Sequence, residues 1–208
     1  MYKIGLVENN FTMLPTYQER LELYDITLLW PPSGSTKEEI VKWILENNIR
    51  CLLVDYKLVP EFEFIGTDLI AYIKRKLPDL SCFILTSFQG DSINENLVEE
   101  NMILERAEFE RSDLSGFISM LKQAVDVCSN RLQLRKDEYI KLLEKRKAGN
   151  LDTEGIEQLL DFYRILRAFD EVDDIPSELL RPEIGQKMDA MLKSLDALIE
   201  KTSQPKGE

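Results

Sequence analysis

Histidine is absent from the 208-residue sequence, and cysteine is sparse. Without histidine, Ser-His-Asp and Cys-His catalysis and histidine-ligated metal sites are excluded, and the chain cannot donate a phosphoryl group from a histidine of its own. The three cysteines, Cys51, Cys82 and Cys128, have no C-x-x-C spacing, so we do not expect a zinc site. Such a small odd number of cysteines is typical of a reducing cytoplasm, where we expect the protein to reside.

Long apolar runs and an excess of basic residues are also lacking. No run of 18 apolar residues occurs, and no signal peptide is visible at the amino terminus, so we expect no membrane contact. Lys and Arg number 26 against 38 Asp and Glu, a formal net charge of −12. Because nucleic-acid binding depends on clustered cations, we expect no nucleic-acid partner.

The first half of the sequence alternates short apolar runs with amphipathic segments. Continuous apolar strands separated by helices predict an α/β fold with a five-stranded parallel, doubly wound sheet that is covered on both faces. The predicted strands are 2–7, 26–30, 51–54, 82–85 and 102–104. Three helices are predicted. Two cover 13–23 and 66–77, and the one between them begins at Ser35, which forms a capping box with Glu38.

The second half, from about Asp113 onward, has only helical periodicity. We predict an α/β domain over 1–127, a helical module over 128–202 and a disordered tail over 203–208. One seam runs through positions 114, 118, 121, 125, 128, 132, 135, 139 and 142, interrupted by Arg135. It can pack within a helical bundle or form a homodimeric coiled coil, and two later amphipathic helices, near 153–166 and 184–198, favour the bundle.

Polar residues follow the predicted strands. The carboxyl ends of parallel strands meet at one edge of the sheet, where α/β proteins bind their ligands. We therefore expect a functional site there. Its candidate residues are Glu8, Asn9, Asp55, Thr86 and Arg106.

Four segments carry a resemblance to the response-regulator receiver domains of two-component signalling. The segments are K-I-G-L-V-E-N-N-F-T-M from Lys3, V-D-Y-K-L-V-P from Val54, G-T-D-L-I from Gly66 and F-I-L-T-S from Phe83. The resemblance covers about residues 1–127. It implies a signalling protein, not an enzyme, that accepts a phosphoryl group on Asp55 from a histidine kinase or phosphotransfer protein.

The resemblance also implies roles for the other strand-end residues. Mg²⁺ would be held by Glu8, Asn9, Asp55 and the backbone carbonyl of Lys57. Thr86 would hydrogen-bond a phosphoryl oxygen, and Arg106 would supply the cation after the fifth strand. The helical half would mediate partner binding or dimerisation.

Two departures from the family pattern argue against phosphorylation of Asp55. Asn9 stands where the family has a second carboxylate, and Glu105-Arg106-Ala107 replaces the usual lysine and proline. These changes motivate an alternative, a pseudo-receiver that acts as a phosphorylation-independent interaction module. A flavodoxin-like enzyme is disfavoured, because no glycine-rich phosphate loop follows the first strand.

One interpretation of the basic stretch between 131 and 147 is a nucleic-acid surface. Acidic residues are interleaved with the basic ones and no aromatic row accompanies them. We therefore predict a solvated helix face whose charges pair with the third helix or with a partner.

Overall fold

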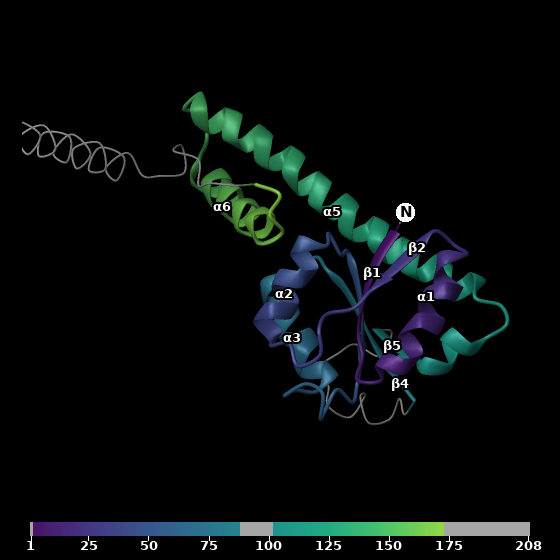
Figure 1. The fold of residues 1–208 in the computed structure, drawn as a ribbon. Helices are drawn as coiled ribbons and strands as arrows, with labels where there is room; N and C mark the ends of the chain where they lie inside the picture. The colour runs from purple at the N-terminus through teal and green to yellow at the C-terminus, as the bar shows by residue number, and fades with distance from the viewer. Residues whose placement is uncertain (1, 88–101, 173–208) are drawn as a thin grey trace, which may run out of the picture.

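A computed structural model describes residues 2–87 and 102–172 (Figure 1). Its centre is a five-stranded parallel sheet in the order β2-β1-β3-β4-β5, so the predicted fold class is confirmed. The strands are β1 (Tyr2–Val7), β2 (Ile26–Leu29), β3 (Cys51–Asp55), β4 (Ser81–Thr86) and β5 (Ile103–Glu105). The predicted strands agree with these to within about one residue at each end.

Helices cover both faces of the sheet, as continuous apolar strands require. Helices α2 (Lys37–Glu46) and α3 (Gly66–Lys76) bury one side, and α1 (Leu14–Glu22) lies on the other with the beginning of α5 (Ser115–Lys147). Two 3₁₀ turns, η1 (Phe11–Met13) and η3 (Arg106–Glu110), follow β1 and β5. β3 is buried along its whole length, so both faces of the sheet contribute to the core.

Helix α2 begins one residue later than the sequence predicted. Its capping box is formed by Thr36 and Glu39: the Glu39 N–H donates to the Thr36 hydroxyl at 3.2 Å, and a Glu39 carboxylate oxygen accepts from the Thr36 N–H at 2.8 Å. The predicted pair, Ser35 and Glu38, is therefore wrong. Ser35 instead donates its hydroxyl to the Pro32 carbonyl at 2.8 Å, which closes the preceding turn.

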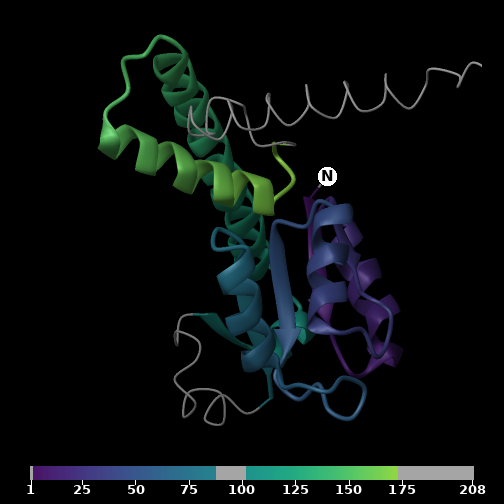
Figure 2. The same cartoon turned by 90° about the vertical axis from the view of Figure 1, so that its left-hand side faces the viewer.

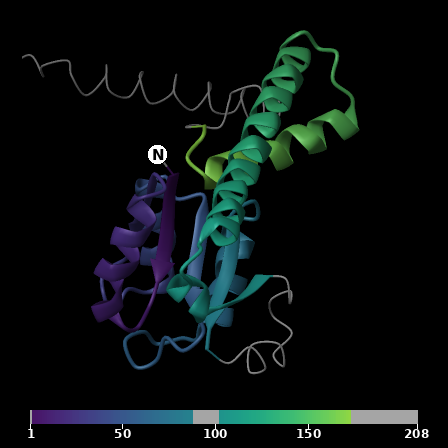
Figure 3. The ribbon, with the colours of Figure 1, turned by 90° about the vertical axis from the view of Figure 1, so that its right-hand side faces the viewer.

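Helix α5 is 33 residues long and extends beyond the sheet, where α6 (Thr153–Ala168) packs against it (Figures 2 and 3). The predicted seam is buried except at Val125 and Arg135, which are half-buried. Ile118 and Leu121 pack on the sheet, whereas Tyr139 and Leu142 pack on α6. The predicted boundary at 127 falls inside this single helix. The last predicted helix and the tail lie outside the described residues.

Ion pairs join the helical half to the amino-terminal edge of the sheet. Arg135, the predicted interruption of the seam, pairs with the buried Asp79 at 2.7 Å. Glu171 pairs with Arg50 at 2.9 Å and with Lys136 at 3.2 Å. Part of the basic stretch thus forms ion pairs within the chain, but with Asp79, after α3, and with Glu171, not with α3 itself. Among the helices in the described ranges, none has the length and apolar character that crossing a membrane requires.

Candidate functional site

The four predicted strand-end side chains converge at the carboxyl edge of the sheet. Asp55 is the last residue of β3 and Thr86 the last of β4, while Glu8 and Arg106 directly follow β1 and β5. Parallel pairing aligns Asp55 with Leu85 and Thr86 with Glu105. Glu8, Asp55 and Thr86 are only 1%, 5% and 3% exposed, so the site consists of buried polar groups.

The guanidinium of Arg106 bridges the two carboxylates. Its Nη1 lies 2.5 Å from Oε2 of Glu8, and its Nη2 lies 2.6 Å from Oδ1 of Asp55 and 3.4 Å from Oε1 of Glu8. Oε1 of Glu8 also accepts the Asn10 N–H at 3.0 Å. Charge-assisted bonds from one planar fork to two carboxylates hold three strand ends together.

The backbone that carries Arg106 is itself anchored on α1. Phe109, which is fully buried, stacks on Tyr17 with ring centroids 4.3 Å apart and meets Phe117 edge-on at 4.9 Å. Arg20 donates to the carbonyls of Phe109 and Arg111. Arg106 is thus presented to the site from a turn that aromatic packing and side-chain hydrogen bonds fix in place.

Burial governs the protonation behaviour of the cluster. Desolvation and the neighbouring Glu8 charge raise the pKa of Asp55 to about 6, although Arg106 and the Lys57 N–H act to lower it. Desolvation disfavours the charged guanidinium, but its bonds to Glu8 and Asp55 outweigh this effect and raise the pKa of Arg106. Burial likewise raises the pKa of Tyr17, against the lowering effect of the adjacent Arg106.

The predicted Mg²⁺ ligands bind protein partners in this arrangement. The space between the Glu8 and Asp55 carboxylates contains the Arg106 guanidinium, a cation that both already bind. The Lys57 carbonyl accepts the Asn9 side-chain amide at 2.5 Å, so Asn9 presents a donor, not an oxygen ligand, to its neighbour. Across 2–87 and 102–172, no three acidic or cysteine side chains are grouped to hold a metal.

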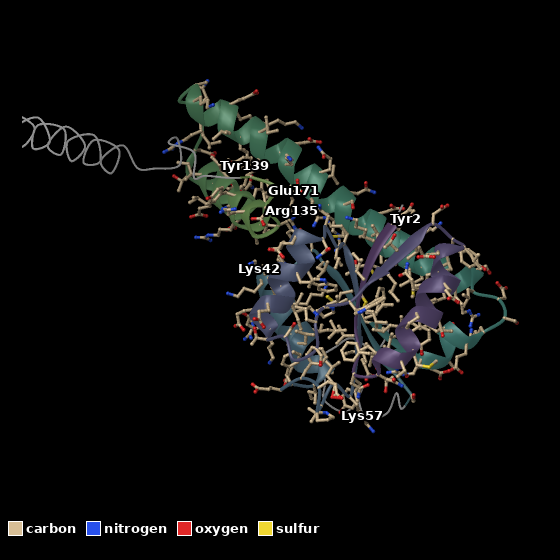
Figure 4. All side chains as sticks on the ribbon, in the orientation of Figure 1. Tyr2, Lys42, Lys57, Arg135, Tyr139 and Glu171 are labelled. Atoms are coloured by element: carbon tan, nitrogen blue, oxygen red, sulfur yellow. The ribbon has the colours of Figure 1, made fainter. Side chains whose placement is uncertain are left out.

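Gly66 brings the start of α3 against the acceptor strand. A Cβ added at Gly66 would lie 2.3 Å from the Asp55 carbonyl oxygen, so only glycine allows this approach. The Gly66 N–H donates to the Tyr56 carbonyl at 3.0 Å, and the Tyr56 N–H donates to the Leu85 carbonyl at 3.0 Å. The residue after Asp55 is therefore fixed between α3 and β4 (Lys57, close by, is labelled in Figure 4).

The sequence predicts where the site lies but not all of the residues that form it. The structure brings Glu8, Asp55 and Arg106 into contact and places Thr86 at the neighbouring strand end, with Asn9 and Lys57 at the rim. Tyr17 was not predicted to take part, because its place in an amphipathic helix marks it as a core residue. Only its partner Phe109, which is remote in sequence, brings it beside Arg106.

No family model matches the chain, and no curated protein sequence matches it. Solved structures do match: a signal receiver domain of an HD domain-containing protein from Pseudomonas fluorescens Pf-5 is 17% identical, with 62% of this chain and 90% of that chain covered and a TM-score of 0.49.

Two further receiver domains give similar values. One from Methanospirillum hungatei JF-1 is 15% identical over 63% of this chain and 98% of its own, with a TM-score of 0.47. One from Clostridium thermocellum is 22% identical over 64% of this chain and 98% of its own, with a TM-score of 0.46. At such identities the likeness concerns the fold alone.

The strand order is the most direct evidence of fold type. An open parallel sheet in the order 2-1-3-4-5 is one of the two common doubly wound arrangements, and its functional residues gather at the carboxyl ends of the strands. Glu8, Asp55 and Thr86 occupy that edge here. The chain therefore has the fold of a response-regulator receiver domain, to which the helical part formed by the end of α5 and by α6 is added.

Proposed function

We propose that this protein is a receiver-type signalling module that acts through protein contacts and does not need phosphorylation of Asp55. The observation that carries the proposal is the ion pair between Arg106 Nη2 and Asp55 Oδ1 at 2.6 Å, with Asp55 only 5% exposed. In this state the carboxylate that would attack a phosphoryl group is engaged by an internal partner. The Asp55 charge is neutralised by Arg106 of the same chain, so no bound cation is required.

The sheet would then serve as a platform that holds the two C-terminal helices in one orientation. Phe169, at the end of α6, is 3% exposed and belongs to the same core as α2 and α3. Figure 4 shows Glu171, Arg135 and Tyr139 at the end of the molecule remote from Lys57. A partner protein would contact α5 and α6, and a second copy of the chain is the alternative that a sizing measurement distinguishes.

We also propose a cytoplasmic location. The three cysteines are free and buried, and a sparse set of unpaired thiols fits a reducing compartment. We propose no catalytic turnover for the chain.

A second candidate function is phosphorylation of Asp55 by a partner histidine kinase, favoured by the convergence of Asp55 with Thr86 at the strand ends. A carboxylate oxygen of Asp55 would bond to phosphorus while the phosphorus–nitrogen bond of the donor histidine breaks. Arg106 would first have to release that oxygen, and it would then pair with the new phosphoryl group.

Intact-mass measurement after incubation with acetyl phosphate and Mg²⁺ distinguishes the two functions. An ordinary receiver treated in parallel serves as the positive control. The proposed function predicts that the wild-type chain gains no phosphoryl mass under conditions that modify the control. A phosphoryl adduct that is lost in Asp55→Asn would refute it and support the second candidate.

A further inference from the structure

We infer that the Arg106 guanidinium takes the place of a divalent cation at the strand ends, so that the chain completes this charge cluster itself and keeps metal out. The inference deepens the proposed function, because it names the group that makes the site independent of metal. It starts from the geometry: one guanidinium reaches carboxylates on two strands, at 2.5 Å to Glu8 and 2.6 Å to Asp55.

The charge of the cluster points the same way. Glu8 and Asp55 contribute two negative charges and Arg106 one positive charge, while Asn9 is neutral. The sum is −1. A divalent cation needs anionic oxygen ligands to offset its dehydration, and here the two carboxylates already share a cation. An aspartate at position 9 would make the net charge of the cluster −2 and would strengthen its attraction for a metal ion.

The turn that carries Arg106 is held in place, which restrains the guanidinium from leaving the two carboxylates. Its turn, η3, is held by the Phe109–Tyr17 stack and by the bonds from Arg20 to two carbonyls of that segment. A tethered group competes with a free ion at a high effective concentration, which is about millimolar or more for short connections. A metal ion would therefore have to displace a cation that the fold itself keeps in place.

The remaining expected ligands are also in use. The Lys57 carbonyl accepts the Asn9 amide at 2.5 Å. To provide an oxygen to a metal, Asn9 would have to turn its amide and leave that carbonyl without this donor. The Arg106 guanidinium and the Asn9–Lys57 bond thus both oppose metal binding.

Mn²⁺ binding, followed through the electron paramagnetic resonance signal of the free ion, tests the inference on the full chain. Wild type is expected to bind no Mn²⁺ at millimolar concentrations. Arg106→Gln is expected to bind one Mn²⁺ per chain and to lose it when Asp55→Asn is added. Arg106→Lys, which replaces the planar guanidinium fork with a point-like ammonium, is a second variant expected to bind Mn²⁺.

Two results would overturn the inference. One is Mn²⁺ uptake by wild type that Asp55→Asn abolishes. The other is the absence of uptake by Arg106→Gln and Arg106→Lys when circular dichroism shows that at least one is folded. Neither result depends on phosphorylation: a chain that excludes Mn²⁺ but gains phosphoryl mass would refute the proposed function and leave this inference standing.

Discussion

Replacing Arg106 with glutamine should destabilise the folded protein strongly at pH 7. The substitution leaves the Glu8 and Asp55 side chains, which are 0% and 7% exposed, without the cation that bridges them. Removing one partner of a buried ion pair costs about 3–5 kcal/mol. Because the Arg106 side chain is 21% exposed, we lower the expectation to roughly 2–4 kcal/mol to allow for solvent screening.

Equilibrium urea unfolding, followed by tryptophan fluorescence, measures this loss. The matched control is Arg111→Gln, which removes an exposed guanidinium five positions away that pairs with Glu108. Its effect should stay within about 0.5 kcal/mol. At pH 5 the effect of Arg106→Gln should shrink, because Asp55, whose pKa is already about 6, becomes protonated and no longer needs the cation. A variant as stable as wild type at pH 7 would refute the reasoning.

Three further predictions follow from the same structure. Burial and Glu8 raise the pKa of Asp55 from 3.8 to about 6, so protonated Asp55 favours folding, and this contribution, at most about 3 kcal/mol, is lost as pH rises from about 4 to 6. Urea unfolding across that range should show a smaller decline in the free energy of unfolding for Asp55→Asn than for wild type. An equal decline would contradict the prediction. Gly66→Ala should lower the melting temperature, because its Cβ would overlap the Asp55 carbonyl oxygen, whereas Gly116→Ala, whose Cβ has open space, should not; equal melting temperatures for the two variants would be inconsistent with a close approach at Gly66. Arg135→Met should cost about 2–4 kcal/mol by leaving the buried Asp79 unpaired, whereas Arg164→Met, which removes an exposed pair with Asp161, should change the free energy of unfolding little; a small effect of the first would show that Asp79 finds another partner.

The fold was largely predictable because its signals are local. Continuous apolar runs such as 51–54 identify buried parallel strands, and the period of the seam identifies α5. The start of α2 was misplaced because Ser35-Thr36 and Glu38-Glu39 offer two capping boxes one residue apart. The choice depends on the preceding turn, in which Ser35 binds the Pro32 carbonyl, and this turn is not evident from spacing alone.

The sequence predicts which residues form the site but not which of them contact one another. Strand ends identify Glu8, Asp55, Thr86 and Arg106, because parallel strands bring their carboxyl ends together. That Arg106 reaches Glu8 as well as Asp55 depends on how η3 is seated on α1 through Phe109 and Tyr17. This contact joins segments about 90 residues apart in sequence, and no local pattern records it.

The most direct test of the central claim is an anomalous difference map from crystals of the wild-type protein grown with MnCl₂. We expect no manganese peak between Glu8 and Asp55, and density for the Arg106 guanidinium bonded to both carboxylates. A manganese peak coordinated by Asp55 and Glu8, with Arg106 turned away, would contradict it.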